Sequence, residues 1–249
     1  MTTTSRAISQ ATAQADRTII PKTIRRPGAE EVDVHATLPQ RVFLLAYSPE
    51  RQLMLSRTHL GATLQAAALY ELHELGLIHD DAGKVRATSG RTGRARAAVP
   101  PCELAADLLA RIEASERAYR WRYWVKKRDG KAVDLVADAL VRHRVIRYET
   151  HRLFGLIPYR RFVLRQAPMR VAAINAMRAA LRGRVAEVPT PDAALAVLAY
   201  HGELRTVLGG RERREAKDRI RALSADLGPV PGALREAVRN TKAELSAAG

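Results

Sequence analysis

The sequence predicts a mainly α-helical domain that carries one or two small β-hairpins. Apolar residues recur at three- and four-residue steps in several segments, and proline or glycine residues delimit these segments, which is typical of helices. One segment, residues 146–166, is instead rich in β-favouring residues. With 249 residues, 47% of them hydrophobic, the chain is long enough to bury a substantial core.

Residues 1–37 are expected to form a disordered leader, which leaves residues 38–249 as one domain. The leader is rich in Thr, Ala and Arg and has little apolar periodicity. It lacks the apolar run of a signal peptide, and no later segment approaches the ~18 apolar residues of a membrane-spanning helix. We therefore expect a protein that does not cross a membrane.

The first ordered elements are expected between residues 41 and 94. Residues 41–55 (RVFLLAYSPERQLML) indicate either a strand pair or a helix followed by a turn. Residues 57–78 contain the clearest helix, a core helix that Thr58 can cap and Gly76 can end. Residues 80–94 then have the turn residues of a β-hairpin wing.

The middle of the chain is predicted to contain two helices and a hairpin. Two consecutive prolines introduce an amphipathic helix over residues 102–118. A turn is predicted at Asp129 and Gly130, and the apolar spacing that follows predicts a helix over residues 131–145. Residues 146–166 lose this spacing, and we predict a β-hairpin there.

The last third is predicted to be helical throughout. Thr190 and Pro191 begin one helix, and Gly209–Gly210 are expected to close it. Residues 211–228 are predicted to form a charged amphipathic helix, and Pro231 starts the last one.

The sequence contains no pattern that supports catalysis or a metal site. The single cysteine, Cys102, cannot form an internal disulfide or a thiolate zinc site, and it fits a reducing, cytoplasmic compartment. Residues 89–94 lack the spacing of a phosphate-binding loop, and none of the seven histidines belongs to an HExxH motif. Glu71 and Glu74 are expected at a solvated helix edge rather than as an acid–base pair. We therefore expect neither an enzyme nor a metal or organic cofactor.

The positive charge of the chain is concentrated in one segment. The formal net charge is +16, and residues 119–170 contain fourteen Lys or Arg but four Asp or Glu, a net charge of +10. A localised charge of this size favours a docking face for a polyanion.

Aromatic residues accompany the cations in residues 119–128 (YRWRYWVKKR). On a helix Trp124 shares a face with Trp121 and Val125, and it is either a core anchor or a residue placed at the headgroup level of a bilayer. The cations that follow must face water or an anion, because unpaired buried charge costs several kcal/mol. These cations are Lys126, Lys127, Arg128 and Lys131.

The predicted hairpin has an apolar tip between basic shoulders. Leu153, Phe154, Leu156 and Ile157 flank Gly155, and the neighbouring cations are Arg147, Arg152, Arg160 and Arg161. Each such apolar side chain contributes roughly 1.5–3 kcal/mol when it is buried in lipid or in a partner subunit. The alternative is that the tip folds back on the protein's own core.

Several short segments, in this order, resemble the Golgi phosphoprotein 3 family, from about residue 40 to about residue 245. They are VFLLAYSPERQLML, LGATLQAAALYELHELGLI, DLVADALVRHRVI with LFGLIPYRRFVL, and AALAVLAYHGELRTVLGG with EAKDRIRALS. The resemblance implies an all-α domain with a central bundle wrapped by amphipathic helices, and a hairpin used in self-association and membrane contact. In the eukaryotic members it also implies binding of phosphatidylinositol 4-phosphate and an adaptor role in retaining glycosyltransferases at the Golgi. It implies no catalysis.

The lipid site of the eukaryotic members carries over to this chain only by position. Its tryptophan falls near Ser56, its first arginine near Gln65, and its later arginines near Gly130 and Val133, so none is matched. Neighbouring cations can line a similar pocket, and the headgroup-binding residues predicted on this basis are Arg57, Lys126, Lys127, Arg128 and Lys131. The sequence leaves the identity of the headgroup open.

Three hypotheses follow from these patterns. The first is a cytoplasmic, peripheral membrane protein that binds anionic phospholipid and recruits membrane enzymes as cargo. Its predicted membrane or oligomer contacts are Trp124, Leu153, Phe154, Leu156, Ile157, Arg160 and Arg161.

The second is a DNA-binding regulator, because helices followed by basic hairpins resemble winged helices and the pI is 10.8. Nucleic acid is the less favoured partner, because residues 57–75 have few cations for a recognition helix. The third, a homo-oligomer formed through the 146–166 hairpin, is compatible with either.

Overall fold

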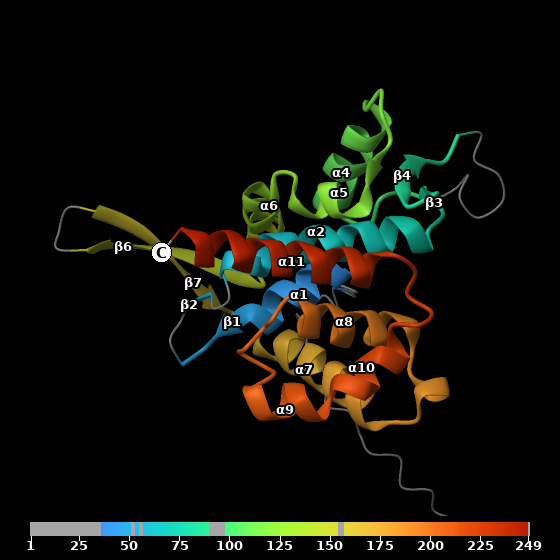
Figure 1. Cartoon of the computed structure of the whole chain (residues 1–249). Helices are drawn as coiled ribbons and strands as arrows, with labels where there is room; N and C mark the ends of the chain where they lie inside the picture. Colours follow the sequence, from blue (N-terminus) through green and yellow to red (C-terminus); the bar gives the residue numbers. More distant parts are fainter. Residues whose placement is uncertain (1–35, 51–52, 55–56, 90–97, 154–156, 249) are drawn as a thin grey trace, which may run out of the picture. The chain divides into compact units, whose positions relative to one another are not determined.

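A computed structural model describes residues 36–50, 53–54, 57–89, 98–153 and 157–248, and from Ala36 onwards these residues form one compact unit (Figure 1). The unit is mainly helical with small antiparallel strand pairs, as the sequence predicts. The expected leader lies outside the described residues.

The first elements form the inner layer of the unit. Helix α1 (Leu38–Ala46) begins with Pro39 in its first turn and is followed by a small hairpin of β1 (Tyr47–Ser48) and β2 (Leu53–Met54). Both elements that the segment 41–55 allowed, a helix and a strand pair, are therefore present. The side chains of residues 42–46 are fully buried, so α1 belongs to the core.

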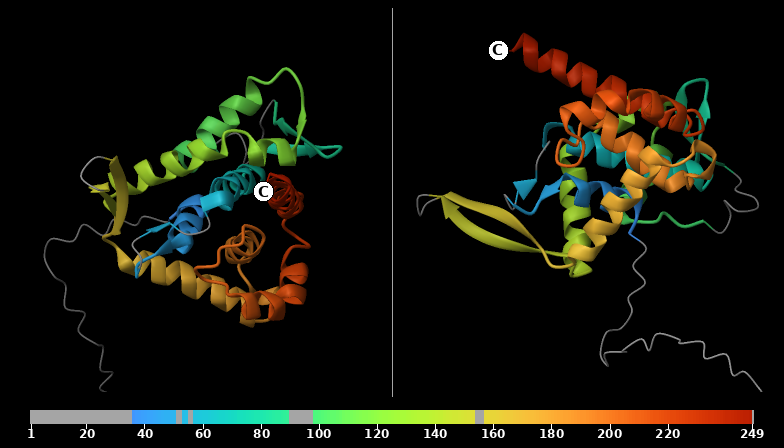
Figure 2. Two further views of the ribbon diagram at one scale, coloured as in Figure 1. Left: turned by 60° about the vertical axis from the view of Figure 1, so that its left-hand side comes forward. Right: turned by 90° about the horizontal axis from the view of Figure 1, so that it is seen from below.

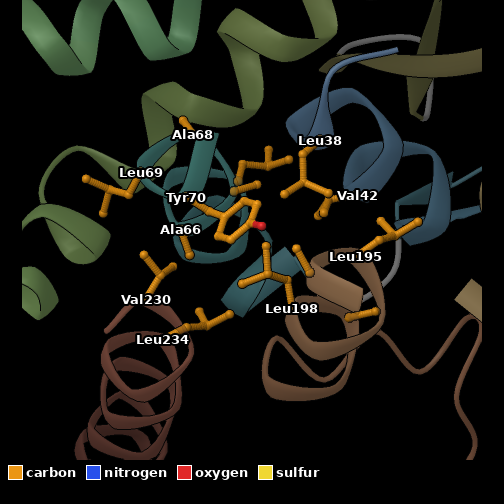
Figure 3. Packing of buried hydrophobic residues seen from close by; sticks show 14 of the residues in the cluster. Leu38, Val42, Ala66, Ala68, Leu69, Tyr70, Leu195, Leu198, Val230 and Leu234 are labelled. Atoms are coloured by element: carbon orange, nitrogen blue, oxygen red, sulfur yellow. The ribbon is translucent and has the colours of Figure 1, made fainter. Parts of the chain in front are cut away.

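Helix α2 (Arg57–Glu74) is the central element of the unit. Residues 59–70 are all buried, and α2 contacts α1, α4, α5, α6, α8 and α11. Figure 3 shows Leu69 and Tyr70 of this helix among side chains of α1, α8 and α11. The expected core helix is confirmed, and its end at Gly76, where φ is 68°, fits the left-handed termination for which glycine is suited.

A three-stranded sheet follows α2. Its strands are β3 (Ile78–Asp81), β4 (Lys84–Ala87) and β5 (Tyr119–Arg120), and Ala82 and Gly83 make the turn between the first two with positive φ. This confirms the first part of the predicted wing, while its residues 90–94 lie outside the described part. Tyr119, the first residue of the segment 119–128, pairs with Val85 of β4.

Three helices cover one side of α2. They are α4 (Glu103–Glu113), α5 (Trp121–Lys126) and α6 (Asp129–Arg142). The predicted turn at Asp129–Gly130 is wrong, because both residues belong to the first turn of α6. The chain reverses one residue earlier, at Arg128, which has a left-handed φ of 61°.

The second hairpin, predicted over residues 146–166, is confirmed. It consists of β6 (Ile146–Leu153) and β7 (Ile157–Leu164), and Figure 2 shows that it extends away from the helices. Its base is fixed to the core: the rings of Phe43 and Phe162 meet edge to face at 5.7 Å, and the Tyr47 hydroxyl donates a hydrogen bond to the carbonyl oxygen of Phe162 at 3.0 Å. The connecting residues 154–156 lie outside the described part.

The last third is helical, but two predicted boundaries are wrong. The elements are α7 (Ala167–Arg182), a short 3-10 turn (Val185–Glu187), α8 (Thr190–His201), α9 (Gly210–Glu215), α10 (Lys217–Leu223) and α11 (Val230–Ala247). Helix α8 ends at His201, Glu203 then takes a left-handed φ of 55°, and Leu204, Val207 and Leu208 pack in the core. Gly209 and Gly210 begin α9, and the charged segment 211–228 divides into α9 and α10 at Ala216.

None of the helices within the described ranges combines the length and the apolar composition needed to traverse a bilayer.

Candidate functional site

Four of the predicted headgroup cations gather where α5 meets α6. Lys126 ends α5, Lys127 and Arg128 connect the two helices, and Lys131 lies in the first turn of α6. Lys127, Arg128 and Lys131 are exposed, and Lys126 is half-buried. We call these four residues the junction cluster. Arg57 begins α2, but its side chain lies outside the described part.

Two side chains of the junction cluster already bind other side chains of the protein. The Lys126 Nζ donates a hydrogen bond to Thr241 Oγ1 of α11 at 2.6 Å, and the Lys131 Nζ lies 3.4 Å from Asp107 Oδ1. The Lys127 Nζ lies 5.4 Å from the centre of the Tyr123 ring, a weak cation–π contact. Within the described ranges, neither Lys127 nor Arg128 has a carboxylate at ion-pair distance, so these two cations are available to an external anion.

The N-terminus of α6 adds to the positive potential of the junction cluster. No side chain caps this 14-residue helix, and its first backbone N–H groups lie beside the cations. Gly130 is exposed, and a Cβ built on it would meet no atom within 4 Å. The backbone of this turn is therefore open to an approaching phosphate or carboxylate.

Gln65 of α2 supports the connection between α5 and α6 from the core side. It is 1% exposed, and its Nε2 donates a hydrogen bond to the carbonyl oxygen of Lys127 at 3.1 Å. An Arg111 guanidinium nitrogen donates to the same oxygen at 3.3 Å. The Gln65 Oε1 is buried and has no hydrogen-bond partner in the part that the structure describes. These contacts fix the connection between α5 and α6, and with it the directions in which Lys127 and Arg128 leave the backbone.

Close backbone packing sets the first turn of α6 on α2. A Cβ built on Gly61 of α2 would lie 2.2 Å from the carbonyl oxygen of Asp129, which no real carbon atom can do. A glycine is therefore required at this crossing. The resemblance assigns the positions of Gln65 and Gly130 to a lipid site. The helix crossing and the Gln65 hydrogen bond place these two residues near each other. Val133 is half-buried one turn further along α6, and Ser56 lies outside the described residues.

The predicted membrane contact at Trp124 is wrong in this fold. Trp124 is 3% exposed and packs edge to face against Tyr123, with ring centres 5.2 Å apart. Trp121 is also buried and donates a hydrogen bond to Asp80 Oδ1. The aromatic residues of the segment 119–128 thus serve mainly to attach α5 to the core, which is the alternative that the sequence left open.

The hairpin contacts remain predictions. Phe154 and Leu156 lie outside the described residues, and of Leu153, Ile157 and Arg160 only the backbone is described. Arg161 is half-buried on β7. The junction cluster lies at the start of α6 and β6 follows its end, so the 14 residues of α6 separate the two by about 21 Å along the helix axis. A surface that uses both must run along α6 rather than form a single compact patch.

The predicted position of the Glu71 side chain is wrong. Instead of lying at a solvated edge, its Oε1 accepts a hydrogen bond from the backbone N–H of Leu38 at 2.6 Å, at the start of α1, and its Oε2 is buried. Burial raises the pKa of this carboxyl to about 7, although the Leu38 N–H and the charge of Arg41 partly oppose the shift. Glu71 therefore joins α2 to α1 rather than facing a substrate.

Helix α2 cannot act as a DNA-recognition helix, because its residues 59–70 are enclosed by other helices. The winged-helix alternative therefore has no structural support. The described ranges also hold no group of three or more His, Cys, Asp and Glu side chains placed to share a metal ion.

The model of one protein family, described as Golgi phosphoprotein 3 (GPP34), matches residues 38–241. The match runs from α1 into α11 and includes both the junction cluster and the β6–β7 hairpin. A comparison with curated proteins gives no match.

Proposed function

Because the chain belongs to the Golgi phosphoprotein 3 family over residues 38–241, we propose that it is a peripheral membrane protein that binds anionic phospholipid. The observation that carries the proposal is the junction cluster, where Lys127 and Arg128 are exposed, have no carboxylate partner among the residues that the structure describes, and lie beside the uncapped N-terminus of α6. A phosphorylated headgroup suits this arrangement, because it can accept hydrogen bonds from both the cations and the backbone N–H groups.

The headgroup is a phosphoinositide-like one, phosphatidylinositol 4-phosphate in the eukaryotic members. The resemblance places arginines at positions that are Gln65, Gly130 and Val133 in this chain. The cations that replace them come from the connection between α5 and α6, and they recognise phosphate charge more than the shape of one sugar ring. We therefore expect several anionic headgroups to compete for this site.

The attraction supplied by the junction cluster is modest and reversible. Each basic residue near an anionic membrane surface contributes about 1 kcal/mol, so the two available cations, Lys127 and Arg128, contribute about 2 kcal/mol, which corresponds to a Kd of about 30 mM. Stable docking needs a second contact. The hairpin supplies it through its tip, Leu153, Phe154, Leu156 and Ile157, with Arg160 and Arg161 beside it, or through self-association that multiplies the weak contacts.

Docked in this way, the protein acts as an adaptor on the cytoplasmic face of a membrane and not as an enzyme. Its cargo would be membrane enzymes, as the resemblance implies. The exposed faces of the outer helices then remain free for cargo, while α6 and the hairpin face the lipid.

Vesicle co-sedimentation tests the proposal. We expect the protein to sediment with vesicles that contain about 10% phosphatidylinositol 4-phosphate and not with neutral phosphatidylcholine vesicles. Lys127→Glu/Arg128→Glu should weaken binding at least about tenfold and up to about a thousandfold, since reversing two charges changes the attraction by up to about 4 kcal/mol. Equal sedimentation with neutral and anionic vesicles would contradict the proposal.

A matched control separates the site from the general charge of the protein. Arg184→Glu/Arg211→Glu makes the same change in net charge at two side chains that are 84% and 86% exposed, away from the junction cluster. This variant should bind anionic vesicles nearly as well as the natural protein does. If both double variants lose binding equally, total charge and not the junction cluster is responsible.

A further inference from the structure

A concave surface is lined mainly by residues of α10 and α11. Figure 1 labels these two helices. The surface has a volume of about 530 Å³, within the range of ordinary small-molecule sites. Helix α11 directs Glu236 and Thr241 toward α5, where they meet Arg122 and Lys126, whereas Arg235 and Arg239 line this surface. The surface is thus on a different face of α11 from the junction cluster.

The lining of this surface is strongly positive. The lining contains six cations and one carboxylate, that of Glu203. We call this surface the basic groove. Its cations are Arg213, Lys217, Arg221, Arg235, Arg239 and Lys242. Glu203 is paired with Lys242 at 2.5 Å, and Arg221 is paired with Asp218 at 3.0 Å. Lys217, Arg235 and Arg239 have no ion-pair partner within the described ranges. Three positive charges in the described part therefore face the basic groove with no carboxylate at ion-pair distance.

The walls of the basic groove are held in place by contacts within the protein. A guanidinium nitrogen of Arg213 donates a hydrogen bond to the Tyr200 carbonyl oxygen at 2.5 Å, and its Cζ lies 4.4 Å from the centre of the Tyr200 ring. His201 lies at the same end, and burial lowers its pKa to about 4, with a further contribution from the charges of Arg235 and Arg213. The ring is therefore neutral near pH 7 and adds no charge of its own.

The floor of the basic groove is apolar. Ile220 of α10 is 2% exposed and Val238 of α11 is 5% exposed, and Pro231 is also buried. The hollow continues past Arg213 and Lys217 into a second one of about 410 Å³, which adds Arg205 and Arg214 to the lining. A ligand that fits this lining has an apolar face and several negative charges along its length.

We propose that the basic groove binds a soluble organic phosphate that carries at least two phosphate groups, at a site separate from the junction cluster. One phosphate cannot neutralise three unpaired cations, whereas a diphosphate or triphosphate can. The planar, forked guanidinium groups of Arg235 and Arg239 match phosphate oxygens, and the apolar floor accepts the organic part. Binding removes the repulsion among the cations, so the ligand also stabilises the fold.

Titration calorimetry with inorganic phosphate, pyrophosphate and ATP tests the proposal. We expect pyrophosphate to bind at least about tenfold more tightly than phosphate, because it engages more of the cations, and ATP to bind as tightly as pyrophosphate or more tightly. Lys217→Gln/Arg239→Gln should weaken pyrophosphate binding at least about tenfold. Both residues are exposed and unpaired within the described ranges, so the unliganded variant should fold normally, with a melting temperature equal to that of the natural protein or slightly higher because two repelling charges are gone.

Two further variants locate the effect. Lys84→Gln/Arg117→Gln removes two exposed charges outside the basic groove and should change pyrophosphate affinity less than about twofold. Lys127→Glu/Arg128→Glu, in the junction cluster, should leave pyrophosphate affinity nearly unchanged, so failure of the lipid proposal and failure of this one are distinguishable. An equal loss in the groove variant and the Lys84/Arg117 variant would overturn the proposal.

Competition against a fluorescent ATP analogue distinguishes a soluble phosphate from a lipid headgroup and from an acidic protein segment. Free pyrophosphate should displace it, and vesicles with phosphatidylinositol 4-phosphate should not. Displacement by those vesicles and not by free pyrophosphate would assign the basic groove to a lipid headgroup and overturn the soluble ligand. A ten-residue polyglutamate peptide that displaces the analogue as well as pyrophosphate does would overturn it in favour of an acidic protein segment.

Discussion

Replacing Gly61 by alanine should force α6 away from α2. The new Cβ would lie 2.2 Å from the carbonyl oxygen and 2.6 Å from the carbonyl carbon of Asp129. A carbon atom and a carbonyl oxygen pack at about 3.3 Å, so the first turn of α6 must retreat by about 1 Å. Because the obstructing atoms are backbone, no rotation of a side chain can relieve the contact.

The expected cost can be estimated from two opposing effects. Overpacking of a core typically costs 1–3 kcal/mol, and the backbone contact places Gly61→Ala at about 3 kcal/mol. Alanine is favoured over glycine within a helix by about 1 kcal/mol. We therefore expect the free energy of unfolding to fall by about 2 kcal/mol, measured by urea denaturation as a lower midpoint with an unchanged slope.

Gly232→Ala is the matched control, since Gly232 is also helical but a Cβ there meets no atom within 4 Å. This variant should be about 0.5–1 kcal/mol more stable than the natural protein, because only the helix preference acts. If Gly61→Ala also raises the midpoint, the close crossing of α2 and α6 is wrong. Vesicle binding of Gly61→Ala should also decrease, because the displaced turn carries the junction cluster.

Three further changes test other parts of the fold. Glu71 has a pKa of about 7 in the folded protein against an ordinary value of 4.5, so the folded state holds its proton more tightly and its contribution to stability is lost as the pH rises from about 4.5 to about 7. Glu71→Gln should remove up to about 3 kcal/mol of this pH dependence, seen by urea denaturation at pH 5 and pH 8, and an unchanged dependence would refute the burial of this carboxyl. Leu69→Ala, at a fully buried position, should cost about 2–5 kcal/mol, and a loss below about 1 kcal/mol would be inconsistent with the packing in Figure 3. Phe162→Ala removes the ring contact with Phe43 and should speed amide hydrogen exchange in β6 and β7, whereas unchanged exchange would mean that this contact does not hold the hairpin.

Local sequence patterns were sufficient to predict the elements that carry regular apolar spacing or clear end signals. The helix of residues 57–78, the helix after Pro101 and the 146–166 hairpin are all confirmed. Each is specified by residues close together in the chain, namely periodic leucines, a proline start or a run of β-favouring residues. The charge maximum of residues 119–170 likewise pointed to the junction cluster.

The features that the sequence did not predict depend on contacts between distant segments. Arg128 takes a left-handed conformation beside a connection that Gln65 holds from 62 residues away along the chain. The carboxyl group of Glu71 is buried because the start of α1, 33 residues earlier, packs against it. The cations of the basic groove come from α9, α10 and α11, and each segment alone has the composition of a solvated helix. No local pattern distinguishes these cases from their exposed counterparts.

Gln65 and Gly130 differ in how freely they can be replaced. Gln65 is enclosed and bonded to the chain above it, so most replacements there would damage the architecture before they altered ligand choice. Gly130 borders open space, and a side chain introduced there would project freely over the α6 turn. A substitution at Gly130 can therefore change the side chains around the proposed anion site at little cost in stability, while the supporting layer below it stays the same.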